Sequence, residues 1–437
     1  MNNRTYTDVL LFMLVIGISV FPYNLSATED INNATDIITP EIPVEFNIDS
    51  NKTISAELDE PETIEELLLE KEKALADSNL GPTGQSPLTI LKQTIQPGEL
   101  RELNWSVGQS FSGKTVKPRV VVVRGNKSGP VLCLVAAIHG DELNGIEIVR
   151  RVIRNIDPME VNGTVIGVPI VNIYGFTANS RYLPDRRDLN RYFPGNPTGS
   201  AASRIANRFF TQIINHCNFV VDFHTGSFKR NNLPQLRADM NIPGVREFVG
   251  HFGSTAVLHK SGHGKSLRAA ATLAGIPTVA FELGQPGSLQ EEYVEAGIET
   301  INTLIGNLGI LEKMRLWFKP QPIYYSSRWV RVNSGGILMS KVKIGANVKT
   351  DQLLGYIINP LTTDEIKIVS PVKGRVLGMA LNQFMLPGYA AFHIGVSSDS
   401  SSMVEEEQLN DNSNEDLEDE VDDDEYNVQT SEEEEMY

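Results

Sequence analysis

From Pro118 to Ile310 the sequence alternates short apolar runs with stretches of helical spacing. The runs are apolar at nearly every position, which is typical of strands that are buried on both faces of a sheet. Strands that alternate with helices predict an α/β domain with a mostly parallel, mixed sheet flanked by helices. The five clearest runs are RVVVVRG, VLCLVAAIHG, TVIGVPIVN, FVVDFHTGS and AGIPTVAFELG.

The helical stretches disappear after about Pro320, and short strand-like segments separated by Gly, Pro and Asn continue to about Ser397. This change predicts a second, small all-β domain, a barrel, over residues 318–398. The α/β pattern is assigned to a separate domain over residues 85–312.

The N-terminus has the features of a secretory signal peptide. One early arginine precedes an apolar run from Val9 to about Val20, and a small residue follows at Ala27. We expect cleavage after residues 1–27 and export to the periplasm or the medium. The run is shorter than the roughly 20 residues that a spanning helix needs. A membrane anchor formed by residues 9–20 is the alternative.

The formal net charge of −17 is distributed unevenly along the chain. Residues 405–437 contain 17 acids and no Lys or Arg, and residues 28–77 contain 15 acids and three Lys. We therefore expect an acidic, low-complexity linker over residues 28–84 and a disordered acidic tail over residues 399–437. Residues 78–404 carry a net charge of +12, which favours anionic ligands. No basic stripe interleaved with aromatic residues is present, so we expect no nucleic-acid partner.

Two of the apolar runs end in metal-binding residue types. His139 and Glu142 follow VLCLVAAI at a spacing of three, and His224 ends FVVDF. A turn with a capping acid also explains the first pair. The carboxyl ends of parallel strands, however, meet at one edge of a sheet, so the three side chains are expected to converge. Two imidazoles and a carboxylate, with water in the fourth position, are typical of catalytic zinc. Asp222 is expected to support this site from outside.

Two further motifs supply polar side chains. Glu282 ends the run TVAFE, where a carboxylate is costly unless it has a partner or a function, and we expect it to act as a general acid/base. The motif SRYLPDRRDLNRYFPG contains Arg181, Asn190 and Arg191. Guanidinium groups bind carboxylates and stabilise a developing oxyanion, so this motif predicts substrate binding and a catalytic role for Arg191 at the oxyanion.

HGDE, RY…DLNRYFPG, DFHTG and FELG, in this order, resemble the succinylglutamate desuccinylase/aspartoacylase family, which has a zinc carboxypeptidase-like fold. The resemblance covers about residues 100–312. It implies one Zn²⁺ per chain and a role for each matched residue. The implied zinc ligands are His139, Glu142 and His224, the implied general acid/base is Glu282, and the implied substrate-binding residues are Arg181, Asn190 and Arg191.

The sequence departs from the family pattern at two places. The segment LPDRR separates Arg181 and Tyr182 from DLNR, whereas the corresponding pair stands closer in aspartoacylase. The nearest candidate for a further carboxylate-binding arginine is Arg268, whose spacing to Glu282 is longer than in aspartoacylase. The acyl group and the amine partner of the substrate are therefore left open, as is the oligomeric state.

The β-rich domain resembles biotinyl/lipoyl modules through the stretch EIKIVSPVKGRVLG. Lys367 is too close to Pro371 to be the modified lysine of a carrier hairpin, so we expect a wall of the active site rather than a swinging arm. His393 has apolar strand neighbours and is expected to be a core or rim residue rather than a metal ligand.

We assign no catalytic or ligand-binding role to the two cysteines or to one glycine-rich loop. Cys133 and Cys217 lie in or beside apolar runs and are expected to be small core residues; a disulfide is compatible with export but not required. SGHGKS lacks the full phosphate-binding pattern, so no nucleotide is expected.

The function predicted from these observations is that of a zinc-dependent amidohydrolase, a deacylase. It would remove the acyl group from the nitrogen of a small, anionic, N-acyl amino-acid-like substrate. One alternative is a zinc carboxypeptidase or amidase that acts on cell-wall peptides, and another is a non-catalytic binding protein on the same fold.

Overall fold

The computed structural model describes residues 85–109, 115–312, 321–362 and 364–396. The predicted signal peptide (1–27), the linker (28–84) and the acidic tail (399–437) lie outside these residues. Within them, no helix is long and apolar enough to cross a membrane.

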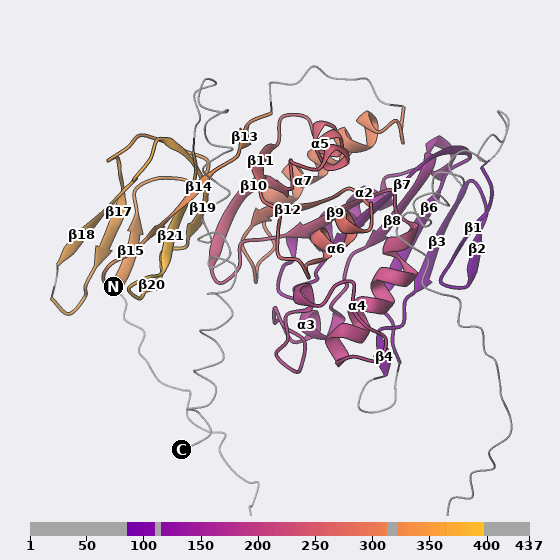
Figure 1. The fold of residues 1–437 in the computed structure, drawn as a ribbon, viewed down its shortest axis with the longest axis horizontal. Coiled ribbons are helices and arrows are strands. Elements are labelled where there is room, and N and C mark those ends of the chain that lie inside the picture. Colours follow the sequence, from indigo (N-terminus) through magenta and orange to yellow (C-terminus); the bar gives the residue numbers. More distant parts are fainter. Residues whose placement is uncertain (1–84, 110–114, 313–320, 363, 397–437) are drawn as a thin grey trace, which may run out of the picture. The chain divides into compact units, whose positions relative to one another are not determined.

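A mixed sheet forms the centre of the α/β part, as predicted (Figure 1). Its middle strands β12, β9, β7 and β8 are parallel neighbours, whereas β10, β6 and β3 pair antiparallel. In their order across the sheet, the strands are β10 (Arg230–Ala238), β12 (Thr278–Gly284), β9 (Phe219–His224), β7 (Lys127–Ala136), β8 (Asn162–Val168), β6 (Arg119–Arg124) and β3 (Glu99–Asn104).

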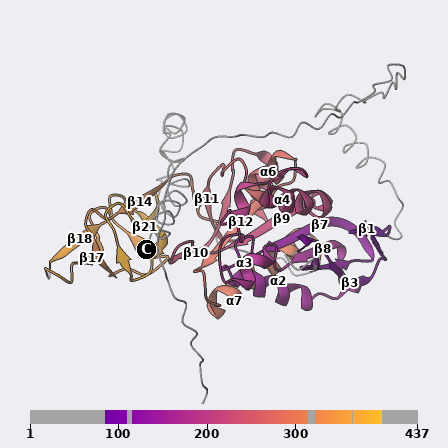
Figure 2. The same cartoon turned by 90° about the horizontal axis from the view of Figure 1, so that it is seen from below.

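Helices cover both faces of this sheet, which explains the continuously apolar strands (Figure 2). Successive strand residues point to opposite faces. Leu132 and Leu134 of β7 pack into the core under α2 (Asn144–Arg154), α5 (Pro243–Gly250) and α7 (Glu291–Asn307). Cys133 and Val135 pack into the opposite core, under α4 (Ala201–Gln212) and α6 (Leu267–Leu273). Both faces of the strand are therefore buried.

The predicted β-rich region is present after residue 320 and has its own apolar core. One of its sheets has the order β18-β17-β15-β20, and the strands β14, β21 and β19 form another layer, with β16 beside β19. These strands are β14 (Ser327–Arg331), β15 (Gly336–Ser340), β16 (Asn347–Val348), β17 (Leu353–Ile358), β18 (Glu365–Val369), β19 (Gly374–Ala380), β20 (Phe384–Met385) and β21 (Ala390–Val396). We call residues 321–396 the C-terminal module.

The C-terminal module shares a sheet with the α/β part. Residues 230–232 of β10 pair antiparallel with residues 378–380 of β19. A second junction pairs β11 (Ala256–His259) with β13 (Ile323–Tyr324). Strand β10 therefore has β12 on one side and β19 on the other, and this arrangement brings β21 and β14 towards the edge where the α/β strands end.

Shorter elements complete the described structure. Two small hairpins pair β1 with β2 and β4 with β5, and one short helix follows β8. These elements and the 3-10 turns are β1 (Leu88–Ile90), β2 (Gln93–Ile95), β4 (Gly108–Gln109), β5 (Thr115–Val116), η1 (Pro158–Glu160), α3 (Ile173–Thr177), η2 (Leu189–Arg191) and η3 (Ile214–His216).

A disulfide joins Cys133 of β7 to Cys217, just before β9, with their Cα atoms 5.8 Å apart. Both residues are buried in the core beneath α4 and α6, as expected for small core residues. The sequence left the bond open. The two cysteines lie close enough to bond because β7 and β9 are neighbours in the sheet.

The helix packing yields a stability prediction. Leu304 of α7 is fully buried, whereas Leu273 at the end of α6 is 81% exposed. We expect Leu304→Ala to lower the free energy of unfolding by about 2–5 kcal/mol, because it removes buried methyl groups and leaves a cavity. The matched control Leu273→Ala should change it by less than about 0.5 kcal/mol. Urea unfolding followed by circular dichroism measures both. Equal losses in the two variants would contradict the assigned core.

Candidate metal centre and active site

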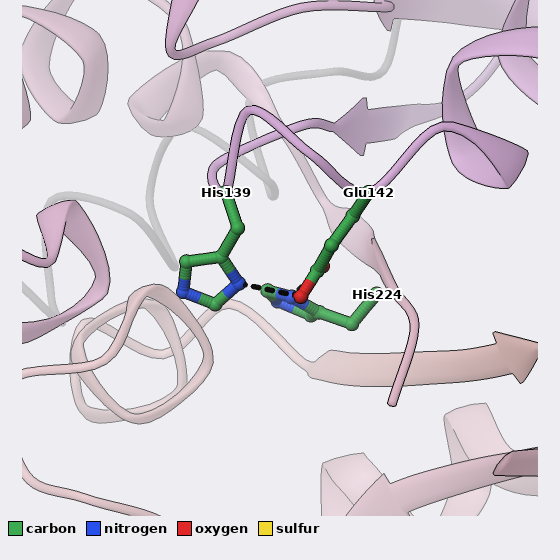
Figure 3. Close-up of side chains that lie close together, drawn as sticks. All are labelled: His139, Glu142 and His224. Atoms are coloured by element: carbon green, nitrogen blue, oxygen red, sulfur yellow. Dashed lines mark hydrogen bonds and ion pairs between the residues drawn. The ribbon is translucent and has the colours of Figure 1, made fainter. Parts of the chain in front are cut away.

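The three predicted metal ligands converge at the carboxyl ends of β7 and β9 (Figure 3). The Nδ1 atoms of His139 and His224 each lie 2.9 Å from one oxygen of the Glu142 carboxylate. One ligand atom from each residue lies within 4.8 Å of the other two, and all three residues are buried. Two nitrogens and one oxygen thus face a common point.

Each imidazole is held from its other side by an aspartate. The Nε2 atom of His139 lies 3.1 Å from Asp188, and the Nε2 atom of His224 lies 2.9 Å from Asp222. Such contacts fix the ring orientation and leave the opposite nitrogen to bind a metal. Asp222 was expected to support the site, whereas Asp188 was missed. Its signal was present in the sequence as the first residue of DLNR.

Charges inside this cluster dominate its protonation. Burial tends to raise the pKa of Glu142, but the charges of His139 and His224 outweigh it and hold that pKa well below its usual range. Burial lowers the pKa of His224, yet the charges of Asp222 and Glu142 outweigh it and raise the pKa well above its usual value. Excess negative charge therefore surrounds the two imidazoles, which is a setting that favours a bound cation.

The turn that carries His139 and Glu142 is packed tightly. A Cβ atom on Gly140 would lie 2.0 Å from the backbone of Gly175 in α3, so only glycine fits there. The backbone carbonyl of Asp141 accepts a hydrogen bond from Gly287 N at 2.8 Å. The turn is therefore held in place through its backbone.

Arg181 lies at the metal cluster despite the longer spacing to DLNR. Its Nη2 donates to Asp188 at 2.9 Å, and its Nη1 lies 3.2 Å from His139 Nδ1 and 3.5 Å from a Glu142 oxygen. Burial raises the pKa of Asp188, but Arg181 and His139 outweigh it and lower that pKa well below its usual range. The guanidinium is thus oriented by a buried, charged carboxylate.

Glu282 lies beside the metal cluster. It is the register partner of His224 in the parallel pair β12–β9, so the two side chains leave the sheet on the same face. Asn232 donates to one of its oxygens at 3.0 Å, and Arg237 lies 3.4 Å from the other. Neither partner was identified from the sequence.

The three metal-ligand candidates, Arg181 and Glu282 line one cavity of about 140 Å³. Asn190, Arg191 and Arg268 also line it. The Asn190 side-chain oxygen accepts from Leu267 N at 2.8 Å, which ties DLNR to the start of α6. Arg268 donates to the carbonyl of Lys260 at 2.7 Å. The structure therefore brings all eight predicted site residues to a single cavity.

The cavity is strongly cationic. Among the described residues that line it, six are arginines or lysines and three are carboxylates. The cationic residues are Arg181, Arg191, Arg230, Arg237, Lys260 and Arg268, and the carboxylates are Glu142, Asp222 and Glu282. The C-terminal module contributes Trp329 and the buried His393, which was expected to be a core or rim residue.

Comparisons with known proteins find relatives of the segment that forms this site. Residues 128–307 match the succinylglutamate desuccinylase/aspartoacylase catalytic domain. This segment is similar to that family. It is 29% identical over 300 residues to N-alpha-acetyl-L-2,4-diaminobutyric acid deacetylase from Halomonas elongata; the match covers 64% of this chain and 84% of the relative.

Solved structures share the fold. The product-bound ectoine utilization protein EutE from Ruegeria pomeroyi superposes with a TM-score of 0.63 at 22% identity, over 71% of this chain and 98% of that one. A succinylglutamate desuccinylase/aspartoacylase from Rhodobacter sphaeroides gives a TM-score of 0.62 at 22% identity, over 72% of this chain and 100% of that one. The matched family domain is that of a desuccinylase and an acylase, and the curated relative is a deacetylase, so the segment that forms the cavity is similar to deacylating enzymes.

We predict that replacing a metal ligand and replacing a supporting aspartate weaken metal binding to different extents. We expect His224→Ala to lose stoichiometric metal, because it removes one of three ligands. Asp188→Asn should keep the metal but bind it about 10–100-fold more weakly, since it alters only the support of His139. Metal content by mass spectrometry and chelator competition measure the two effects. His216→Ala is the matched control, because His216 lies outside the cavity. Full metal content in His224→Ala would rule the cluster out as the binding site.

Proposed function

We propose that the chain is a zinc-dependent amidohydrolase whose metal is held by His139, Glu142 and His224. The observation that carries the proposal is the convergence of one ligand atom from each of the three residues to within 4.8 Å of the others, with Glu282 on the neighbouring strand. Two nitrogen donors and one oxygen donor suit zinc, and a set of three protein ligands is typical of catalytic rather than structural sites. The aspartate behind each imidazole fits the same assignment.

When bound, zinc supplies a Lewis acid for the amide carbonyl and lowers the pKa of water. Glu282 is placed to accept the proton of the attacking water and to pass it to the departing amine nitrogen. The new carbon–oxygen bond then replaces the carbon–nitrogen bond, and the products are a carboxylate and an amine. Asn232 and Arg237 each contact one oxygen of Glu282, and these contacts orient the carboxylate for both transfers.

Arg181 is placed to stabilise charge on the substrate oxygen. Its Nη2 is engaged by Asp188, while its Nη1 lies 3.2 Å from His139 Nδ1, at the front of the cluster. An oriented guanidinium in a largely buried site stabilises an oxyanion with little reorganisation. Arg191 and Arg268 line the same cavity and are candidates for binding the substrate carboxylate.

The size and charge of the cavity favour a small anionic N-acyl amino acid over a cell-wall peptide. The space measures about 140 Å³, and the C-terminal module supplies part of its wall through Trp329 and His393. The comparison that decides is turnover of N-acyl amino acids against turnover of wall-peptide fragments by the purified protein. Cleavage of the fragments alone would replace the proposed substrate class.

We propose the same wall function for the C-terminal module as a whole, which by sequence resembles a biotinyl/lipoyl barrel. Lys367 lies within β18, paired with Tyr356 of β17, rather than in a hairpin turn. A carrier lysine needs an exposed turn, so this position supports a wall rather than a swinging arm.

The role of Glu282 is tested by an isosteric change. We expect Glu282→Gln to retain metal and to lower kcat by about 10²–10⁴-fold, because the amide cannot accept the proton of water. Steady-state kinetics on an N-acyl amino acid, together with the metal content of the same sample, measure both effects. Activity within threefold of wild type, by contrast, would remove Glu282 from the proton transfer.

We also propose export of the chain, with cleavage near Ala27. The buried Cys133–Cys217 disulfide supports an oxidising compartment, because disulfides rarely persist in the cytosol. Expressed with its own N-terminus in a bacterium with a periplasm, the mature chain should begin near residue 28 and contain no titratable thiol. N-terminal sequencing and thiol titration of the periplasmic fraction check this. Recovery of an intact N-terminus with two free thiols would contradict export.

A further inference from the structure

The C-terminal module has one open strand edge. In the sheet β18-β17-β15-β20, β18 pairs with β17, and no described strand lies on its other side (Figure 1). An edge strand presents a row of unpaired backbone N–H and C=O groups, so it can pair with a strand of another chain. Proteins commonly prevent this with very short edge strands or with proline. Strand β18, EIKIV, is five residues long and contains no proline, so it is able to pair.

The backbone groups that face the open edge belong to every second residue of β18. In an antiparallel pair, successive residues direct their N–H and C=O groups alternately towards the neighbouring strand and away from it. The Asp364 carbonyl, just before β18, accepts a hydrogen bond from Asn359 N, and Ser370 N, just after it, donates to the carbonyl of Gln352. The even-numbered residues of 364–370 therefore direct these groups towards β17. The odd-numbered residues of β18 direct theirs to the open edge.

The side chains at this edge combine exposed apolar surface with two opposite charges. Ile366 and Val369 of β18 are each 42% exposed, and Leu361 in the preceding turn is 92% exposed. Glu365 and Lys367 stand on either side of Ile366, and both are exposed. Neither charge has an ion-pair partner within the described part of the chain. The edge therefore carries an acid and a base placed symmetrically about an exposed isoleucine.

We propose that β18 pairs antiparallel with β18 of a second copy of this chain, about a two-fold axis at Ile366. In this register Glu365 of each copy lies opposite the partner's Lys367, and the two Ile366 side chains face each other. Glu365 and Lys367 are odd-numbered, so their backbone groups face the edge and form the hydrogen-bonded pairs. The Ile366 pair is then of the non-hydrogen-bonded type, in which the side chains lie closer together. Backbone groups, charges and apolar surface are satisfied by one register.

The other registers of a two-fold pair leave the charges unmatched. Side chains on one face of a strand must meet side chains on the same face of its neighbour, so the axis passes through a residue. An axis at Glu365 or at Lys367 places two like charges directly opposite each other, which is destabilising. An axis at Ile368 places Lys367 opposite the partner's Val369. Of these positions, only Ile366 gives each charge an opposite partner.

The second copy fits this edge better than the acidic segments of the same chain do. Residues 28–77 and 405–437 are strongly acidic, whereas β18 carries one acid and one base and so has no net charge to attract them. A two-fold dimer uses the same surface on both subunits and closes on itself, and such dimers are the commonest oligomers. No residue of β18 belongs to the described lining of the cavity, so the inference is independent of the proposed reaction.

Charge reversal tests the register. We expect the purified chain to form a dimer in sedimentation equilibrium at high micromolar concentration. Lys367→Glu and Glu365→Lys each place like charges opposite each other twice, so each should raise the dissociation constant at least about tenfold. The double variant Glu365→Lys/Lys367→Glu restores opposite charges and should return the constant to within about threefold of wild type. Lys343→Glu, the same change at an exposed lysine outside β18, is the matched control and should leave it unchanged.

Three sedimentation results overturn the proposal: a wild-type monomer, a dimer that the single charge reversals leave intact, or a double variant as weak as the single ones. Hydrogen exchange distinguishes a second copy from another segment of the same chain. The amides of Glu365 and Lys367 should exchange slowly only at concentrations at which the dimer forms. Slow exchange in the dilute monomer shows that the chain itself covers β18, and it overturns the second copy as the partner.

Discussion

The site depends on the contacts of the His139 and His224 imidazoles with the two oxygens of the Glu142 carboxylate. All three groups are buried, and burying charged groups is unfavourable unless each has a partner. Asp188 and Asp222 provide those partners behind the rings, and Arg181 closes the network by contacting Asp188, His139 and Glu142. The arrangement leaves two nitrogens and a carboxylate close together, the donor set proposed above to hold the metal.

The rest of the cavity depends on the position of strand β10, which pairs with strands of both the α/β part and the C-terminal module. On one side it pairs with β12 and supplies Asn232 and Arg237 to the Glu282 carboxylate. On the other side it pairs with β19, and so draws the C-terminal module towards the same edge. The C-terminal module contributes His393 and Trp329 to the cavity wall. Both the α/β part and the C-terminal module thus contribute side chains to the cavity.

Sequence reasoning identified the metal ligands and Glu282 at the strand ends, but not the partners of Glu282 inside strand β10. His139, His224 and Glu282 each follow or end an apolar run, and the carboxyl ends of parallel strands meet at one edge, so their convergence was predictable. Asn232 and Arg237 lie five residues apart in β10, an odd separation that places residues on opposite faces of a regular strand. An irregularity between Asn232 and Gln235 shifts the register, and both side chains reach Glu282. No period-two pattern reveals such a shift.

The sequence by itself determined the α/β class, the β-rich module and the set of residues brought to the metal cluster. Those conclusions depend on local patterns: apolar runs, helical spacing and polar residues at strand ends. Tertiary structure alone decided the Cys133–Cys217 bond, the support that Asp188 gives to His139 and the place of His393 in the wall. Each joins segments dozens of residues apart or more, and their meeting depends on strand order and register, which no local pattern encodes.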